Sequence, residues 1–289
     1  MSAKQKQSMP PPLPHDSIYT SCYCEENVYL LAKAFASKAE EDADWPWQVS
    51  VVFISNHGKT VALWNQKARE GVVVWDYHVI LVLRSRDHMQ SSEQDPTHRE
   101  DGERRTEPAE DGWVYDFDTR LTVPSRWTDY VSNTFPYVFN EAFSVPLEYQ
   151  RQAYFRCFVW ASADFKLVLY LRNDMHGYSL FRVVPAAAYL DYFASDRSHM
   201  LSDGSGPTPH YTSAPPSYPT LCGIRAQESG IINNLMDAYV SMVLLHEPPP
   251  LEPEIRLAHK IAEPRNPYGE VMGMPDFLRW LAGETGGDA

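Results

Sequence analysis

The sequence lacks the features that would place it in a membrane, outside the cell or on a nucleic acid. No apolar run approaches the roughly 18 residues that a membrane span needs. Residues 1–14 contain no apolar core of signal-peptide length. The 25 Lys and Arg are outnumbered by 38 Asp and Glu, and the net charge of −13 repels a phosphate backbone. We therefore expect a cytoplasmic protein, or one shared between cytoplasm and nucleus, that binds neither nucleic acid nor membranes.

Several catalytic signatures are also missing. The chain has no Gly-rich phosphate loop, no Gly-x-Ser-x-Gly elbow and no His-Glu-x-x-His motif. Cysteine is scarce, with four residues, and the Cys-x-x-Cys spacing of many zinc sites is absent. Zinc on Cys22, Cys24 and His78 is therefore disfavoured, and we expect neither a metal nor a cofactor.

Length and composition favour one domain with long irregular segments. The 289 residues are 44% hydrophobic, which is enough for a sizeable core, and 23 prolines cluster in a few places. We predict a disordered tail over 1–16 and a single domain over 17–282. The domain carries a polar insertion at 84–112 and Pro-rich loops at 202–221 and 247–254.

The apolar pattern changes from a helical period to a strand period and back. Apolar residues spaced by three and four predict helices, and short β-branched runs predict strands. We expect helices over 25–39, 186–193, 228–245 and 275–282, and strands over 48–54, 61–64, 72–83, 113–118, 155–161, 165–171 and 180–184. The predicted fold class is α+β, an α/β sandwich in which helices flank a central, mostly antiparallel sheet.

The strongest predicted strand covers residues 72–83. It is apolar on both faces, so we expect it at the centre of the sheet, antiparallel to 113–118 across the polar insertion. Alternation places Asp76 and His78 on the same face. Two polar side chains that share a buried face need partners, which indicates a polar pocket.

A thiol lies at the start of the first predicted helix. The free N–H groups and positive dipole at a helix N-terminus would stabilise a thiolate at Cys24 and lower its pKa. Cys22 competes for this role, and a buried, inert thiol is the alternative for either residue.

An imidazole and a carboxylate complete a possible catalytic set. His78 could be the base for a cysteine nucleophile, although a histidine among valines can also be a satisfied core residue. Asp116 on the neighbouring strand could orient the imidazole, with Asp118 and Asp76 as rivals on the same faces. Capping of a turn is the alternative role for such an aspartate.

Five sequence motifs occur together in one order. They are Ser21–Asn27 (SCYCEEN), Val52–Asn56 (VFISN), Trp75–Val79 (WDYHV), Tyr115–Thr119 (YDFDT) and Phe193–Met200 (FASDRSHM). From its residues alone, the last motif could be a helix cap or the rim of a site. Together the motifs resemble the protein N-terminal glutamine amidohydrolase family.

The resemblance implies an activity and assigns the catalytic residues by motif. Members deamidate an N-terminal Gln to Glu with release of ammonia, in the N-degron pathway. The family nucleophile is the second Cys of Cys-Tyr-Cys, its base the His of Trp-Asp-Tyr-His, and its acid the first Asp of Tyr-Asp-x-Asp. These are Cys24, His78 and Asp116 here. The family fold is an α/β sandwich akin to transglutaminases and papain-like enzymes, without a metal.

The implied substrate is a protein or peptide with a free N-terminal Gln, and the enzyme is expected to be a monomer. Contacts with other N-degron components are also expected. The free amine of the substrate needs a pocket lined by carboxylates or carbonyls, and the candidate residues for it are Glu25, Asp76 and Asp196. Two other classes stay open: a transglutaminase- or protease-like cysteine acyl-transfer enzyme, and a non-catalytic adaptor with a degenerate site.

Overall fold

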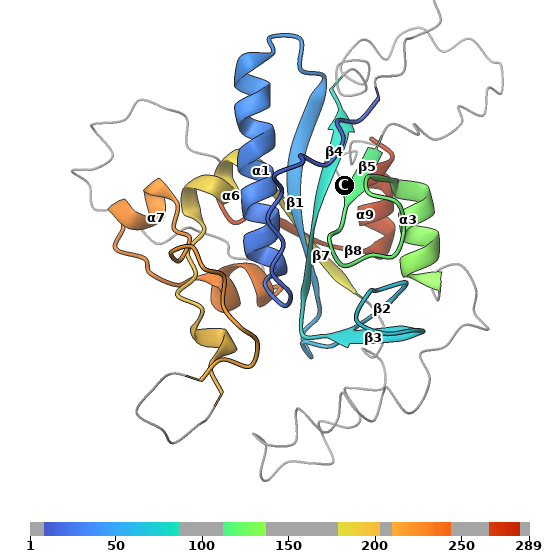
Figure 1. Ribbon diagram of the computed structural model, residues 1–289. Coiled ribbons are helices and arrows are strands. Elements are labelled where there is room, and N and C mark those ends of the chain that lie inside the picture. The colour runs from blue at the N-terminus through green and yellow to red at the C-terminus, as the bar shows by residue number, and fades with distance from the viewer. Residues whose placement is uncertain (1–8, 87–111, 137–178, 203–209, 244–265, 284–289) are drawn as a thin grey trace, which may run out of the picture.

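The computed structural model describes residues 9–86, 112–136, 179–202, 210–243 and 266–283. Within these ranges, six strands form one sheet in the order β6-β5-β4-β1-β7-β8, and every neighbouring pair is antiparallel (Figure 1). This confirms the predicted antiparallel sheet.

The strands are short except at the centre of the sheet. The large sheet contains β1 (Trp47–Ser55), β4 (His78–Ser85), β5 (Gly112–Tyr115), β6 (Ser125–Arg126), β7 (Leu180–Pro185) and β8 (Glu270–Gly273). A separate two-stranded sheet pairs β2 (Val61–Trp64) with β3 (Val72–Trp75).

Helices cover both faces of the large sheet, which makes the fold an α+β sandwich as predicted (Figure 1). None of the helices in the described ranges is long and apolar enough to cross a bilayer. The α-helices are α1 (Cys24–Glu41), α3 (Trp127–Thr134), α6 (Ala186–Tyr192), α7 (Ile224–Glu228) and α9 (Met274–Leu281), joined by a 3-10 turn, η3 (Ser198–Met200), and a π-helical turn, η4 (Leu235–Val240).

The strand alternation of β1 divides the interior into two cores. Val51 and Phe53 pack in the core beneath α1 and α6, whereas Val52 and Ile54 pack in the core beneath α3 and α9. All four side chains are fully buried. A strand that is apolar on both faces must be covered on both sides, so the sandwich follows from this pattern.

The predicted strand over 72–83 is wrong as a single element. The chain leaves one sheet and joins the other at Asp76 and Tyr77, because β3 pairs with β2 and β4 pairs with β1 and β5. Asp76 is exposed at this break, and its carbonyl accepts a hydrogen bond of 2.8 Å from the Ser55 hydroxyl at the end of β1. The apolar alternation continues through the break, so it does not reveal the change of partner.

The predicted helix over 228–245 is also wrong, since α7 ends at Glu228 and η4 begins at Leu235. Gly230 adopts a positive φ of 68°, which ends a helix. The Asn234 side chain then accepts from the backbone N–H of Ala194 and donates to a nearby carbonyl. Such side-chain bonds compete with a continuous helix.

The remaining predicted elements within the described residues occupy their expected places. The strand predicted over 113–118 is shorter in the structure, because β5 ends at Tyr115 and leaves Asp116 and Asp118 just beyond it. Leu13, in the predicted tail, packs against the core beneath α1. Outside the described residues lie 1–8, residues 87–111 of the insertion, residues 203–209, the loop over 247–254 and the strands predicted over 155–161 and 165–171.

Gly71 and Gly269 have similar positive φ angles but differ in the space available for a Cβ atom. Comparing alanine at the two positions therefore distinguishes the cost of steric contact from that of backbone strain. A Cβ at Gly269 would lie 2.1 Å from the Val183 carbonyl oxygen, whereas a Cβ at Gly71 would meet no atom within 4 Å; their φ angles are +73° and +75°. We predict that Gly71→Ala lowers the free energy of unfolding by about 1 kcal/mol. Gly269→Ala should cost about 2 kcal/mol more, because β8 must move from β7. Urea titration measures both, and equal losses would contradict the predicted close packing.

Candidate active site

The three predicted catalytic residues meet at one end of the large sheet. Cys24 is the first residue of α1, His78 is the first residue of β4, and Asp116 directly follows β5. Because β4 and β5 are antiparallel, the start of the first lies beside the end of the second. The antiparallel pairing of these strands therefore brings the imidazole and the carboxylate together.

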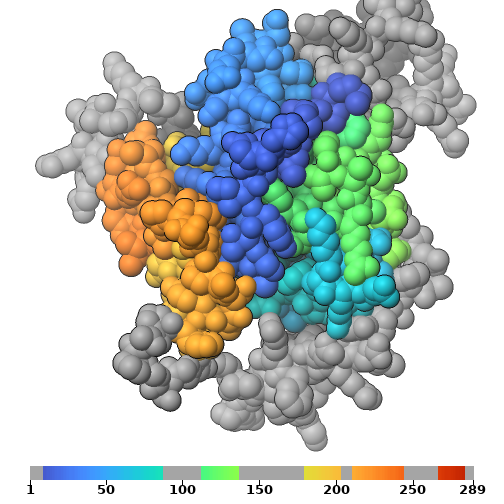
Figure 2. All heavy atoms as spheres, viewed as in Figure 1, coloured from blue at the N-terminus to red at the C-terminus, as the bar shows by residue number. Residues whose placement is uncertain are grey.

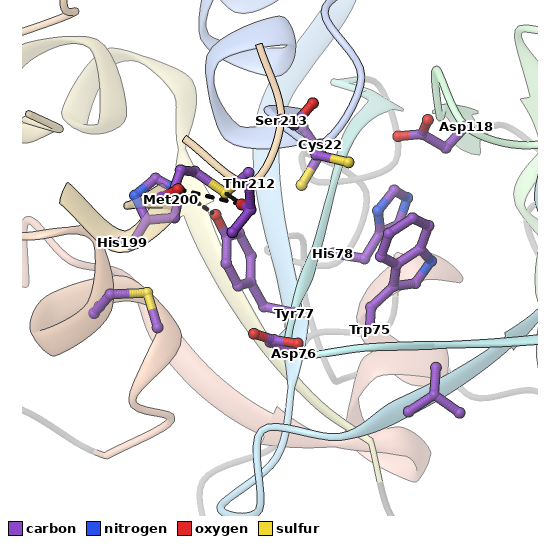
Figure 3. A pocket seen from close by; sticks show the side chains of 13 residues that line it. Cys22, Trp75, Asp76, Tyr77, His78, Asp118, His199, Met200, Thr212 and Ser213 are labelled. Carbon is purple, nitrogen blue, oxygen red and sulfur yellow. Dashed lines mark hydrogen bonds between the residues drawn. The ribbon is translucent and has the colours of Figure 1, made fainter. Parts of the chain in front are cut away.

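A cavity of about 480 Å³ lies at this end of the sheet, and Figure 3 shows the side chains around it. The break between β3 and β4 supplies one wall, and the segments around η3 and before α7 supply the opposite one. The lining residues are Cys22, Cys24, Val74, Trp75, Asp76, Tyr77, His78, Asp118, His199, Met200, Thr212, Ser213 and Met236.

The segment before α1 lies across the surface between the two sides of the site. In Figure 2 this dark-blue segment runs between the orange and the green parts of the chain. The Tyr19 hydroxyl donates to Asp118 Oδ1 at 2.6 Å, and the Tyr23 hydroxyl donates to the Ser213 carbonyl at 3.2 Å. These two bonds attach the start of α1 to both walls of the cavity.

His78 and Asp116 form a buried hydrogen-bonded pair. Nε2 of His78 lies 2.9 Å from Oδ1 of Asp116, and both side chains are excluded from solvent. Leu81 pairs with Tyr115, so continuing the register places Asp116 beside Ile80, diagonal to His78 on the same face. Since Nε2 faces the carboxylate, Nδ1 is the ring nitrogen left to exchange a proton with a thiol.

Asp116 is stabilised as a carboxylate by donors from several segments. Besides His78, its oxygens accept bonds from the Tyr130 hydroxyl at 2.9 Å, the Gln66 amide at 3.3 Å and the Asp118 N–H at 2.8 Å. Burial alone would raise the pKa of Asp116, but His78 and the other donors outweigh it and lower that pKa. The carboxylate is therefore ionised at neutral pH.

The same pair keeps His78 basic in a dry environment. Burial acts to lower the pKa of His78, but the charge of Asp116 and its hydrogen bond reverse the effect and leave that pKa raised. The Trp75 ring stacks on the imidazole, with centroids 6.1 Å apart and planes at 17°. An oriented, basic imidazole at a cavity wall is what a general base requires.

Cys24 lies at the helix start as predicted, but the predicted lowering of its pKa is wrong. Burial raises the pKa of the thiol well above its usual value, and the adjacent Glu25 carboxylate raises it further. A hydrogen bond from the Val79 N–H acts in the opposite direction. The resting thiol is therefore protonated, and it needs a base to become a nucleophile.

Cys22, the rival thiol, also lines the cavity. It lies two residues before α1, is exposed, and adopts a positive φ of 67°. Its Sγ lies 3.6 Å from the Ser21 hydroxyl. Cys22 therefore lies outside the helix that carries Cys24, and on more exposed backbone.

The three predicted amine-binding carboxylates occupy different environments. Asp76 is exposed and lines the cavity. Glu25 is fully buried beside the thiol and is absent from the cavity lining. Asp196 accepts bonds from the Ser198 N–H at 2.9 Å and the Asn233 amide at 2.7 Å, away from the cavity.

The sequence reasoning did not select Tyr77 or His199, which also line the cavity. Both belong to the motifs named above. Tyr77 is a polar residue inside an otherwise apolar predicted strand, and His199 is a polar residue after a predicted helix, and either feature could have indicated a place in the site. It also missed the buried ion pair between Glu26 and Arg197, with N–O distances of 2.7 and 2.8 Å. Arg197 donates further to carbonyls of residues 216, 218 and 219, which fixes that loop to the first turn of α1.

His78, Asp116 and Asp118 also have the residue types of a metal site. One ligand atom from each lies within 4.8 Å of the others. Their oxygens already accept bonds from N–H and O–H groups, including those of Tyr19 and Tyr130. A cation there would displace these donors, so the bonding pattern favours a hydrogen-bonded set.

Known proteins resemble this chain over most of its length. A family model described as N-terminal glutamine amidase matches residues 19–159 and 164–279. The chain belongs to this family. Relatives named protein N-terminal glutamine amidohydrolase include those of Arabidopsis thaliana, 33% identical over 228 residues (78% of this chain, 75% of that protein), and Danio rerio, 30% identical over 281 residues (96% of each). That of Bos taurus is 28% identical over 275 residues (94% of this chain, 91% of that protein).

The donors around Asp116 predict a specific pH dependence of stability. Because the folded pKa of Asp116 lies below its unfolded value, its ionised form stabilises the native state at neutral pH, and this contribution is lost as the pH falls through the folded pKa. Tyr130→Phe removes one donor and should cost about 1 kcal/mol at pH 7. The variant raises the folded pKa of Asp116 toward its unfolded value, so this destabilisation should shrink as the pH falls.

Tyr29→Phe provides the matched control. It removes a buried hydroxyl that donates to the Leu190 carbonyl at 3.0 Å, a group that does not titrate. Urea titrations from pH 3 to pH 7 should show a constant destabilisation for this variant. If Tyr130→Phe showed the same constant offset, its hydroxyl would not stabilise the ionised carboxylate.

Proposed function

We propose that this protein is a cysteine amidohydrolase that converts an N-terminal Gln to Glu and releases ammonia. The observation that carries the proposal is a thiol and an imidazole at one cavity, with a buried carboxylate bonded to the imidazole, in a chain whose relatives are named for this reaction. The proposed nucleophile is Cys24, the base is His78, and Asp116 orients the base. The N-degron pathway and a monomeric state rest on the resemblance, and a cytoplasmic or nuclear location rests on the composition of the sequence. All three are part of the proposal.

In the first half of the reaction, Nδ1 of His78 takes the proton of Cys24. The thiolate attacks the side-chain amide carbon of the terminal Gln and forms a tetrahedral oxyanion. Helix α1 begins without a side-chain cap, which supports its first backbone N–H groups, including that of Cys24, as oxyanion donors. The protonated His78 then donates to the amide nitrogen, and ammonia leaves.

In the second half, the thioester on Cys24 is hydrolysed. Neutral His78 takes a proton from water, and the resulting hydroxide attacks the thioester carbonyl carbon. Collapse of the second oxyanion releases the Cys24 sulfur, which takes the proton back, and leaves a terminal Glu. The net reaction consumes one water for each ammonia released, and Asp116 stays ionised throughout.

Selection of a free terminus requires a partner for the α-ammonium group. Of the three candidate carboxylates, Asp76 has the most suitable position, because it lines the cavity and follows Trp75, two residues before the base. We therefore propose Asp76 as the amine ligand. A substrate whose amine is fixed there must present an amide at the correct distance from the thiol, which favours Gln over the shorter Asn.

The reaction and its nucleophile can be tested together by ammonia release from matched peptides that begin with Gln, Asn or acetyl-Gln. We expect turnover of the Gln peptide and conversion of its terminal amide to a carboxylate by mass spectrometry. Asn should be at least about 100-fold slower, since misplacement by about 1 Å costs that much. Cys24→Ser should lose at least about 1,000-fold.

Cys22→Ser is the matched control and should keep wild-type turnover. Loss of activity in this variant with retention in Cys24→Ser would reassign the nucleophile. Silence of the folded wild type on Gln peptides would reject the proposed reaction. Incorporation of an added primary amine in place of water would instead indicate the transglutaminase-like alternative, and cleavage of the peptide bond the protease-like one.

The amine ligand can be tested by Asp76→Asn. Loss of a charge-assisted hydrogen bond of about 1.5–3 kcal/mol should lower kcat/KM for Gln peptides by about tenfold to 100-fold, mostly through KM. Asp196→Asn removes the same charge outside the cavity and should leave KM unchanged. An unchanged KM in Asp76→Asn, measured by initial rates at fixed pH, would assign the amine to another group.

A further inference from the structure

A second histidine–carboxylate pair lies beside the proposed nucleophile, and the mechanism above does not use it. Glu25 is fully buried in the first turn of α1. The Cys24 thiol donates to its Oε2 at 3.7 Å. The other oxygen, Oε1, accepts no hydrogen bond from the described residues but lies 3.4 Å from Nε2 of His199. A buried carboxylate in this position acts directly on the thiol proton.

Two cavity-lining side chains lie against the Glu25 carboxylate, and one of them donates a hydrogen bond to it. The Tyr77 hydroxyl donates to Oε2 at 3.0 Å and lies 3.3 Å from Nε2 of His199. The His199 side chain is only 7% exposed, and its Nδ1 has no hydrogen-bond partner among the described residues. Figure 3 shows His199 and His78 on opposite sides of the cavity, with Tyr77 between them.

We propose that Glu25 is a positioning residue that keeps the Cys24 thiol protonated and oriented in the resting enzyme. His199 and Tyr77 lie against the Glu25 carboxylate and weaken its effect on the thiol proton. The inference rests on the proposed function for the role of Cys24. In this arrangement His78 deprotonates the thiol during the reaction, and no preformed thiolate–imidazolium pair is needed. The protonated thiol is also a poor target for other electrophiles at rest.

The charges around the thiol favour this direction. Three carboxylates raise the pKa of the thiol through their charge, one from α1 and two from the turn after β5. The two imidazoles lie on opposite sides of the cavity (Figure 3). Burial and Glu25 are the two largest causes that raise the pKa of Cys24. The titratable groups that face or adjoin the thiol are Glu25, Asp116, Asp118, His78, His199, Tyr77, Tyr189 and Cys22.

The proposal predicts shifts of opposite sign for two substitutions within the same pair. Glu25→Gln removes the negative charge beside the thiol, so thiolate should form at lower pH. His199→Gln removes the group that offsets this charge at Oε1, so thiolate should form at higher pH. Tyr77→Phe removes a donor to Oε2 and should act in the same direction as His199→Gln. A role limited to packing would not produce opposite shifts.

The test is the pH profile of iodoacetamide alkylation at Cys24, followed by mass spectrometry of the peptide that contains it. At pH 7 we expect Glu25→Gln to react about tenfold faster than wild type, and His199→Gln and Tyr77→Phe to react more slowly. Glu40→Gln makes the same charge change at the exposed far end of α1 and should not shift the profile.

This measurement uses no substrate, so it is independent of the proposed reaction. Near-UV circular dichroism identifies variants that remain folded, and Tyr77→Phe substitutes for His199→Gln if the latter unfolds. Profiles that coincide with wild type in Glu25→Gln would overturn the proposal. So would a shift of Glu25→Gln in the same direction as His199→Gln and Tyr77→Phe. Failure of ammonia release with the expected alkylation shifts would instead reject the reaction and leave the pair intact.

Discussion

The buried carboxylate of Asp116 is the constraint on which the rest of the site depends. A carboxylate that is buried away from solvent must be surrounded by hydrogen-bond donors. The donors to Asp116 come from β4, α3, the segment after β2 and the turn that contains Asp116. These segments meet only when the large sheet, the small sheet and α3 are all assembled. The bond that orients His78 is therefore a consequence of the complete fold.

The main layers of the fold were predictable because their residues carry simple periodicities. The helix over 24–41 follows from its single apolar face, and β1 follows from a run of residues that is apolar on both faces. The break at Asp76 and Tyr77 was not predictable, since the alternation of apolar residues is the same on both sides and only tertiary pairing separates β3 from β4. The interrupted helix after Gly230 depends on contacts of Asn234 with a distant strand end.

The residues of the site were predictable where a motif identifies them. The ionisation state of the thiol was not, because it depends on how the surrounding side chains pack. The contact between His78 and Asp116 follows from the antiparallel register, and Cys24 begins α1 as expected. The ionisation of the thiol was predicted with the wrong sign, because a helix start was considered without burial or the neighbouring Glu25. His199 lies more than 170 residues after Glu25 in the chain. Its motif was compatible with the rim of a site, but the sequence does not indicate that its side chain approaches Glu25.

The central claim is that Cys24 becomes covalently acylated by the side chain of an N-terminal Gln. Rapid acid quenching during turnover of a Gln peptide, followed by intact and fragment mass spectrometry, tests it most directly. The account predicts an adduct equal to the peptide less one ammonia, on Cys24, which appears before the Glu product accumulates. An adduct on Cys22, or ammonia released in a single burst before any adduct forms on Cys24, would contradict it.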